Sequence, residues 1–195
     1  FWTIGANANH NKNRIRKISN VLEKMNAEAL ASTTAPIPIY QVGHSTTTLY
    51  TVRSLGIDPA TGQEVFLKRN GEKTFTWDAT DKVPVGDTNP KISGAFNTSL
   101  TWKDAYCTLA FTYKWGGIAY NSTLVDKLEN RSVGLNADRR ALTERWIKPG
   151  DVTPYKALSI TGSNTPQSTR FIMDDNELAF SSINIGYRFQ DSKYA

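Results

Sequence analysis

The sequence predicts an all-β chain that forms part of an antiparallel transmembrane β-barrel, with long extracellular loops that carry short helices. Three observations predict this fold. Several runs alternate apolar and polar side chains, as strands with one apolar face do. The connections between these runs are very unequal in length. The chain also combines a mean hydropathy of -0.44 with 5 Trp, 8 Tyr and 8 Phe, which suits a protein with one apolar and one wet face.

The first run covers residues 1–9, where Trp2 and Ile4 point away from Thr3 and Asn7. Two longer runs follow at residues 91–102 and 106–116. Even positions are largely apolar in the first of these and odd positions in the second, while the intervening positions are small or polar. Only residues 103–105, Lys-Asp-Ala, separate the two runs, which predicts a tight antiparallel hairpin.

The last run covers residues 178–189, with Ile183, Ile185, Tyr187 and Phe189 on one face. Leu178 and Phe180 are out of phase with these residues. This change of phase predicts a β-bulge near Ser181.

A soluble β-sandwich is the alternative to the barrel, because its strands alternate in the same way. The polar faces favour the barrel, since they carry Ser, Thr, Asn, Ala and Gly rather than Lys and Glu. The connections favour it too: residues 10–90 and 117–176 separate strands, against three residues at 103–105, and barrels have short periplasmic turns and long extracellular loops.

The long connections contain local signals of their own. Apolar residues spaced three and four apart predict an amphipathic helix over residues 14–30, which we expect to dock on its own protein; a membrane-surface or partner-binding helix is the alternative. Shorter helices are expected at residues 122–130 and at 136–147, where Asn136 could cap the helix. A β-hairpin is expected at residues 49–54 and 65–69, around the turn at residues 58–62.

Composition excludes several classes. No stretch approaches the roughly 20 apolar residues of a membrane-spanning helix. The 23 Lys and Arg, which give a net charge of +5, are scattered rather than gathered in one stripe, which argues against nucleic-acid binding. Cys107 is the only cysteine, so it has no partner for an internal disulfide. Because the chain opens at Phe1 without a Met, we expect it to be a fragment or a processed piece.

Three motifs resemble one bacterial family, the SusC/RagA type of TonB-dependent outer-membrane transporter. The first is GIDPATG at residues 56–62, and the second is VGDTNPK at residues 85–91 entering SGAFN at 93–97. The third is RWIKPGDVT at residues 145–153, with INIGY at 183–187 like the strand that follows it. Each motif alone is common, but their order and spacing are specific. The resemblance covers residues 40–189, and residues 11–18 fit more loosely.

The resemblance implies a C-terminal barrel segment of an active nutrient importer in the bacterial outer membrane, with its loops outside the cell, and no cofactor is expected. It further implies a SusD-like surface lipoprotein over the barrel mouth, a link to TonB through N-terminal parts that this sequence lacks, a glycan or peptide substrate, and contact with membrane lipid. The plug and the remaining barrel strands are likewise absent from the sequence. A soluble all-β ligand-binding or adhesion module is the alternative function.

No catalytic or metal site is predicted. His10 and His44 have no carboxylate or cysteine at metal-ligand spacing, and Asp174 and Asp175 lack the ligand pattern of a calcium loop. The chain is therefore expected not to be an enzyme. Aromatic residues in the long connections are the remaining candidates for contact with a ligand or partner, because flat apolar rings can stack on sugars or side chains. They are Trp77, Tyr120, Trp146 and Tyr155.

Overall fold

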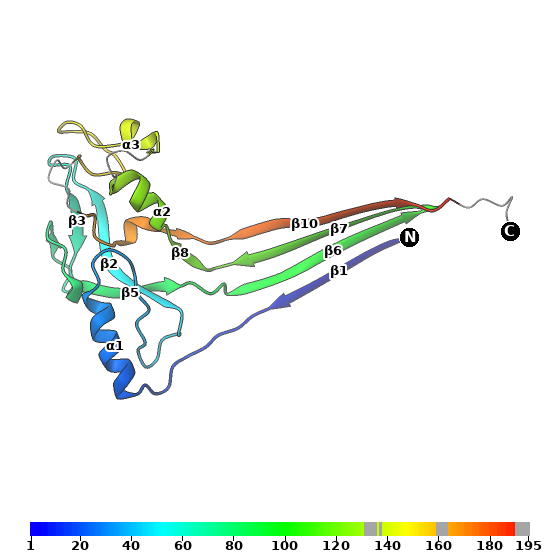
Figure 1. Cartoon of the computed structure of the whole chain (residues 1–195), viewed down its shortest axis with the longest axis horizontal. Coiled ribbons are helices and arrows are strands. Elements are labelled where there is room, and N and C mark those ends of the chain that lie inside the picture. The colour runs from blue at the N-terminus through cyan, green and yellow to red at the C-terminus, as the bar shows by residue number, and fades with distance from the viewer. Residues whose placement is uncertain (131–135, 137, 159–163, 190–195) are drawn as a thin grey trace. The chain divides into compact units, whose positions relative to one another are not determined.

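The computed structural model describes residues 1–130, 136, 138–158 and 164–189. The chain divides into two compact units. Unit 1 consists of Phe1–Lys12, Asn89–Ile118 and Asp174–Ala195, and unit 2 consists of Asn13–Thr88 and Ala119–Met173. Unit 1 holds the four long strands, and unit 2 is built from the two long connections between them (Figure 1).

The described elements follow in chain order. The strands are β1 (Trp2–Asn9), β2 (Thr48–Ile57), β3 (Glu64–Leu67), β4 (Lys73–Thr74), β5 (Lys82–Asp87), β6 (Ile92–Trp102), β7 (Ala105–Trp115), β8 (Ile118–Tyr120), β9 (Ile172–Asp174) and β10 (Glu177–Tyr187). The helices are α1 (Asn20–Ala31), α2 (Ser122–Leu124) and α3 (Arg140–Thr143), with helical turns η1 (Ala79–Asp81), η2 (Val125–Glu129) and η3 (Thr169–Phe171).

The four strands of unit 1 form one antiparallel sheet in the order β1-β6-β7-β10. The predicted hairpin is confirmed, since β6 and β7 pair along their whole length. Its turn is shorter than expected, because Ala105 already pairs with Trp102 and only Lys103 and Asp104 connect the strands. Lys103 takes a φ of 53°, in the left-handed region that tight turns require.

One face of this sheet is apolar from edge to edge. Residues that pair directly across antiparallel strands share a face, so the register places Phe96, Phe111 and Phe180 in one row. Their ring centroids lie 4.6 Å and 5.2 Å apart. The bulge predicted near Ser181 is confirmed, because the register shifts between Phe180 and Ser182 and so brings both Phe180 and Ile183 onto the apolar face.

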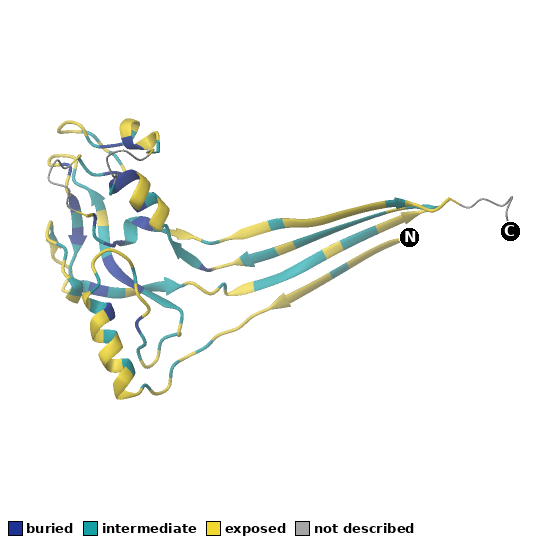
Figure 2. Ribbon diagram, in the orientation of Figure 1, coloured by how far each residue is buried: buried dark blue, intermediate teal, exposed yellow. Residues whose placement is uncertain are grey.

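No described residue of these four strands is buried, on either face (Figure 2). The antiparallel all-β class is confirmed. The closed barrel is not formed within the described residues, since β1 and β10 are open edges of the sheet. Four strands are too few to close, because the smallest membrane barrels have about eight.

Both long connections leave the sheet at the same end. The register sets Asn9 opposite Ser93, Ile92 opposite Trp115, and Lys114 opposite Glu177. The last residue of β1, the first of β6, the last of β7 and the first of β10 therefore lie at one end. The two-residue turn closes the hairpin at the opposite end.

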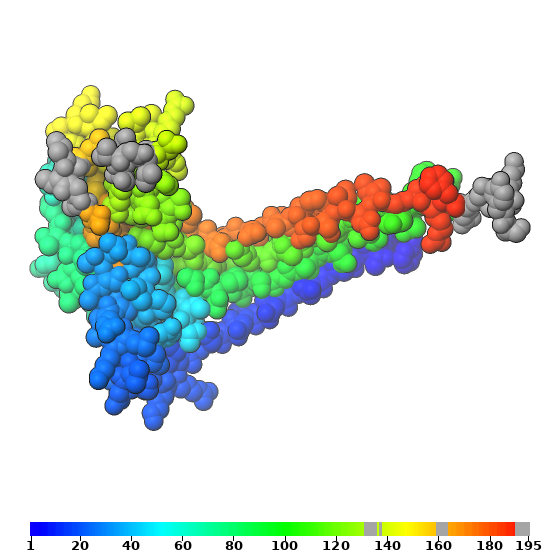
Figure 3. Space-filling view, in the orientation of Figure 1, coloured from blue at the N-terminus to red at the C-terminus, as the bar shows by residue number. Residues whose placement is uncertain are grey.

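Unit 2 is a folded body of its own, which the sequence pattern did not predict. Its sheet has the order β4-β3-β2-β5 and contains the predicted hairpin, in which Ser54 pairs with Phe66. All the apolar side chains that are buried in the described ranges belong to unit 2. Residues of both connections lie against each other in it, as in the bridge between Val52 and Ser168 (Figure 3).

The ends of the first connection are held together inside unit 2. Asn13 Oδ1 accepts a hydrogen bond of 3.0 Å from Thr46 N, and Thr88 N donates one of 3.1 Å to Thr47 O. Residues 13 and 88, far apart in sequence, are thus bonded to neighbouring residues. The segment between them is a closed loop.

The predicted helix over residues 14–30 begins later than expected. Ile15 N donates to His44 O and Ile15 O accepts from Gly43 N, at 2.8 Å and 2.9 Å, so this segment is bonded to residues 43 and 44 and is not helical. Helix α1 starts at Asn20, after Ser19 accepts a hydrogen bond from Leu22 N. The helical spacing of apolar residues therefore includes residues before Asn20 that hydrogen bonds to residues 43 and 44 keep out of the helix.

The two other predicted helices are also shorter than expected. Over residues 122–130 the structure has α2 followed by the wider turn η2. Within 136–147 only α3 is helical, and its N-cap is Arg139 rather than Asn136; the predicted first helical residue, Ala137, lies outside the described residues. Helix α3 ends because Arg145 bridges to Tyr155 and leaves the helical path.

The side chain of a buried lysine binds the C-terminal end of α1. Lys82 is 1% exposed, and its Nζ donates to Ala29 O, Leu30 O and Ser32 O at 3.1, 2.9 and 2.7 Å. The last carbonyls of a helix have no partner within it and carry the negative end of its dipole, so an ammonium group suits this position. Desolvation by burial lowers the pKa of Lys82 to about 8. The lysine therefore fastens α1 to β5.

We expect Lys82→Met to loosen α1, because the carbonyls of Ala29, Leu30 and Ser32 each lose a hydrogen bond. The loss of each such hydrogen bond costs about 1 kcal/mol or more, so backbone amides of residues 20–31 should exchange with solvent at least about tenfold faster. Hydrogen exchange of the full-length protein in detergent measures this. Lys24→Met, at an exposed position of the same helix, is the control. Equal exchange in both variants would contradict the role of Lys82.

Candidate functional site

A buried ion network holds the centre of unit 2. Arg170 donates to Glu64 Oε2 at 2.8 Å and to Glu129 Oε1 at 2.6 Å, and Ser168 Oγ donates to Glu64 Oε1 at 2.5 Å. Desolvation opposes the charge on Arg170, but the hydrogen bonds and charges of the two carboxylates outweigh it and raise the pKa of Arg170. Since Glu64 belongs to the first connection and Glu129 and Arg170 to the second, this network fastens the two connections together.

Neighbouring contacts extend the network to the third sequence motif. The guanidinium of Arg145 donates to Leu128 O and to Lys156 O, and the backbone N–H of Lys156 donates to Glu129 Oε1 at 3.3 Å. Tyr155 is 6% exposed and packs with Leu128 and Ala141. Residues 145–156 are therefore fixed to the ion network by both side-chain and backbone bonds.

The aromatic residues named from the sequence lie in different surroundings. Trp146 and Tyr155 come together, because Trp146 N donates to Tyr155 O at 3.1 Å. The Trp146 indole N–H donates to Pro59 O at 2.9 Å, and its ring covers Gly62, where a Cβ would lie 2.5 Å from the ring. Trp146 therefore joins the third motif to the turn of the first.

Tyr120 and Trp77 lie apart from that pair. The ring of Tyr120 meets Phe171 edge-on at 6.1 Å, and its hydroxyl is buried without a hydrogen-bond partner in the structure. Burial raises the pKa of Tyr120. The Trp77 indole N–H donates to Gln167 O at 2.8 Å, and Trp77 alone of the four lines the largest hollow described in unit 2.

This hollow, which we call the Trp77 pocket, has a volume of about 670 Å³. Residues of both connections line it. They are Thr61, Gly62, Gln63, Glu64, Phe66, Phe75, Thr76, Trp77, Lys156, Ala157, Leu158 and Pro166. Phe75 and Leu158 are more than half exposed, so apolar surface is open to solvent at the pocket. The sequence offered one signal for Phe75, an aromatic residue two positions from Trp77, but none for Lys156 or Leu158, which come from the other connection.

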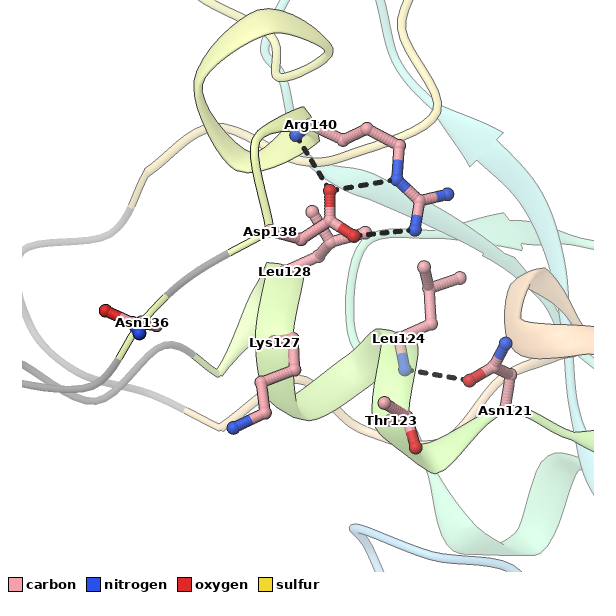
Figure 4. Close-up of a pocket in the computed structure, with 8 residues that line it drawn as sticks. All are labelled: Asn121, Thr123, Leu124, Lys127, Leu128, Asn136, Asp138 and Arg140. Atoms are coloured by element: carbon pink, nitrogen blue, oxygen red, sulfur yellow. Dashed lines mark hydrogen bonds and ion pairs between the residues drawn. The ribbon is translucent and has the colours of Figure 1, made fainter.

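A second hollow of about 330 Å³ lies beside α2 and α3 (Figure 4). Its polar groups bind one another: the Asp138 carboxylate accepts two bonds from the Arg140 guanidinium, at 3.0 Å and 2.8 Å, and Asn121 Oδ1 accepts from Leu124 N at 2.8 Å. Few groups on its wall, Lys127 among them, are left to meet a ligand. The Trp77 pocket is therefore the stronger candidate site.

The histidines have structural neighbours. His10 Nδ1 lies 2.5 Å from Lys91 O, and His44 meets the ring of Tyr50 edge-on. Within the described ranges, no group of three or more His, Cys, Asp or Glu is placed to hold a metal ion. None of the described helices is long and apolar enough to cross a membrane.

Comparison with known proteins gives a consistent likeness. In sequence the chain is similar to the TonB-dependent receptor P39 of Formosa agariphila, with 24% identity over 133 residues, which are 66% of this chain and 12% of that receptor. No protein-family model matches the chain.

In structure the chain is similar to the RagAB peptide transporter, with a TM-score of 0.75 and 21% identity over 99% of this chain. It is also similar to the RagAB peptide importer in a closed-closed state, with a TM-score of 0.74 and 19% identity over 100% of this chain. The chain spans 21% and 22% of the matched chains. The resemblance to SusC/RagA-type TonB-dependent transporters is confirmed.

We expect Arg170→Met to destabilise unit 2 strongly, because it leaves Glu64 and Glu129 buried without their cation. Removing one member of a buried ion pair costs about 3–5 kcal/mol. Limited proteolysis of the full-length protein should then cut unit 2 much faster than in the wild type. Arg140→Met removes an exposed arginine that also binds a carboxylate, and it should destabilise unit 2 far less, because solvent screens that ion pair. Similar cleavage rates in the two variants would show that burial does not matter at Arg170.

Proposed function

We propose that the chain is a segment of an active nutrient importer of the bacterial outer membrane, which is energised through TonB and takes up a glycan or a peptide. The observation that carries this proposal is the four-stranded sheet of unit 1, whose continuous apolar face is not buried. Exposure of such a face to water is unfavourable, whereas its contact with the lipid of a bilayer is favourable. The strands supply part of the barrel wall, and strands outside the described residues complete it.

The two faces of the sheet have different roles in this proposal. The apolar face lies against lipid, and the face with small polar residues lines the lumen. The residues assigned to lipid are Phe96, Leu100, Trp102, Leu109, Phe111, Tyr113, Ile183 and Ile185. Those assigned to the lumen are Asn97, Ser99, Thr108 and Thr112. The turn at Lys103 and Asp104 is then periplasmic, and both long connections are extracellular because they leave the opposite end of the sheet.

Unit 2 is the part that meets the outside in this proposal, including a SusD-like surface lipoprotein and the substrate. The loop of residues 145–153 fits a partner surface. Its turn is fixed, because Asp151 accepts hydrogen bonds from Ile147 N at 3.1 Å and Lys148 N at 3.0 Å, which lower the pKa of Asp151. Trp146 anchors the loop inward, while Ile147 and Val152 are 75% and 87% exposed.

We infer that the chain carries out no catalysis. The proteins that it resembles are named as a receptor, a transporter and an importer. An importer binds its substrate and changes conformation to let it pass. The aromatic residues of the chain suit the binding of a substrate. Trp77 and Trp146 are the proposed contact residues of the long connections, whereas Tyr120 and Tyr155 act from within the core of unit 2.

The lipid-facing assignment is tested by spin labels placed singly along β6, in a Cys107→Ala background. Labels at Thr98 and Leu100 should be reached by oxygen dissolved in the bilayer, and labels at Asn97 and Ser99 by a water-soluble nickel complex. Accessibility should therefore alternate from residue to residue. Uniform exposure to water along the strand would indicate a soluble sheet.

The partner surface is tested by the double variant Ile147→Asp and Val152→Asp in the full-length transporter. Both side chains are exposed, so unit 2 should keep its fold while an apolar contact gains two charges. Copurification with the surface lipoprotein should fall about tenfold or more. Val21→Asp, at a 68% exposed position on α1, is the control and should leave the association intact. If all three substitutions have no effect, the loop is not part of the contact.

A further inference from the structure

The Trp77 pocket combines an apolar wall with the side chain of Lys156, whose ammonium group is bonded to none of the described residues. Half of its lining residues are apolar, with Phe66, Phe75, Trp77 and Leu158 as the large ones. Two of the polar residues at its rim already have partners: Glu64 is bonded to Ser168 and Arg170, and Thr61 to Asp58. The polar chemistry available to a ligand therefore depends on Lys156, together with Gln63 and Thr76.

Lys156 is half-buried, and its ammonium group makes no hydrogen bond or ion pair with any residue that the structure describes. Desolvation lowers the pKa of Lys156, and the nearby arginines 145 and 170 add to this, while Glu129 and Glu64 oppose it. Both of these carboxylates are bonded to Arg170. Among the described residues, the ammonium group of Lys156 is therefore partly desolvated and is bonded to neither carboxylate.

We propose that the Trp77 pocket binds a carboxylate attached to an apolar or aromatic group, and that Lys156 pairs with the carboxylate. A partly desolvated cation without a counter-ion favours an anion strongly, because the pair forms in a medium of lower polarity than water. The ring of Phe75, which is 52% exposed, and the Trp77 ring supply the flat apolar surface for the rest of the ligand.

The proposal names the chemistry of a substrate group and so rests on the proposed function of nutrient import. Two sources carry such a group: the carboxyl terminus of a peptide that ends in an apolar residue, and a uronic acid of a glycan, whose ring has an apolar face. Most neutral sugars lack the carboxylate. Lys156 therefore selects for acidic ligands whichever source supplies them.

Binding to the purified full-length protein tests the proposal, with the change in tryptophan fluorescence and calorimetry as readouts. The probes are N-acetyl-alanyl-phenylalanine with a free carboxylate, the same dipeptide as its C-terminal amide, and a galacturonic acid disaccharide. We expect one of the acids to bind and the amide to bind about tenfold more weakly or worse. Whichever acid binds identifies the source of the carboxylate.

Variants assign the binding to the pocket. Lys156→Met should weaken binding of the acid about tenfold while leaving the fold intact, because it removes a partly desolvated charge that is bonded to none of the described residues; hydrogen exchange of β3 checks the fold. Lys156→Arg should retain binding, and Phe75→Ala should weaken it. Lys148→Met, at an exposed position of the same connection, is the control.

Three results would overturn the proposal: equal binding of the acid and the amide, acid binding that survives Lys156→Met, or no binding of any probe. Each of these would leave the proposed function standing if the spin labels on β6 still alternate between lipid and water. If the labels show a soluble sheet but the acid still binds through Lys156, the pocket is confirmed and the importer is not.

Discussion

A single-layer sheet cannot bury its side chains against itself, and this constraint governs the whole chain. The strands of unit 1 satisfy their backbone hydrogen bonds across the pairs β1-β6, β6-β7 and β7-β10, but none of their described side chains is buried. The apolar face is therefore stable only when something else covers it. Unit 2 meets the opposite condition, since it has a core and polar bonds of its own and needs no membrane.

The core of unit 2 is small, and contacts of charged side chains join many of its segments. Arg170 links two carboxylates from different connections, and Lys82 links β5 to the end of α1. Buried charges add little net stability, because desolvation offsets their attraction, but a misplaced one is costly. Such contacts therefore favour one arrangement of the two connections over others. A surface that must present the same shape to a partner gains from that selectivity.

The sequence predicted those features of the fold that depend on residues close together in the chain. Alternation identified the four long strands and even the bulge at Ser181, because side chains in a strand repeat every second residue. It did not predict unit 2 as one body, since bonds such as that between Glu64 and Arg170 join residues 106 positions apart. The same limit applied to the candidate site. Trp77 could be predicted as an aromatic residue of a long connection, whereas Lys156 becomes a candidate only because two distant segments together form the pocket that it lines.

The bonds that hold Asn13 and Thr88 to residues 46 and 47 have a consequence for the order of folding. β1 and β6 are separated by the whole first connection, and closing a flexible loop of that length carries an entropic cost of about 4 kcal/mol. If unit 2 forms first, the ends of that connection are already close, and β1 can align with β6 as though the loop were short. Folding of unit 2 would then precede and accelerate completion of the sheet, although the β6-β7 hairpin, with its two-residue turn, can form independently of unit 2.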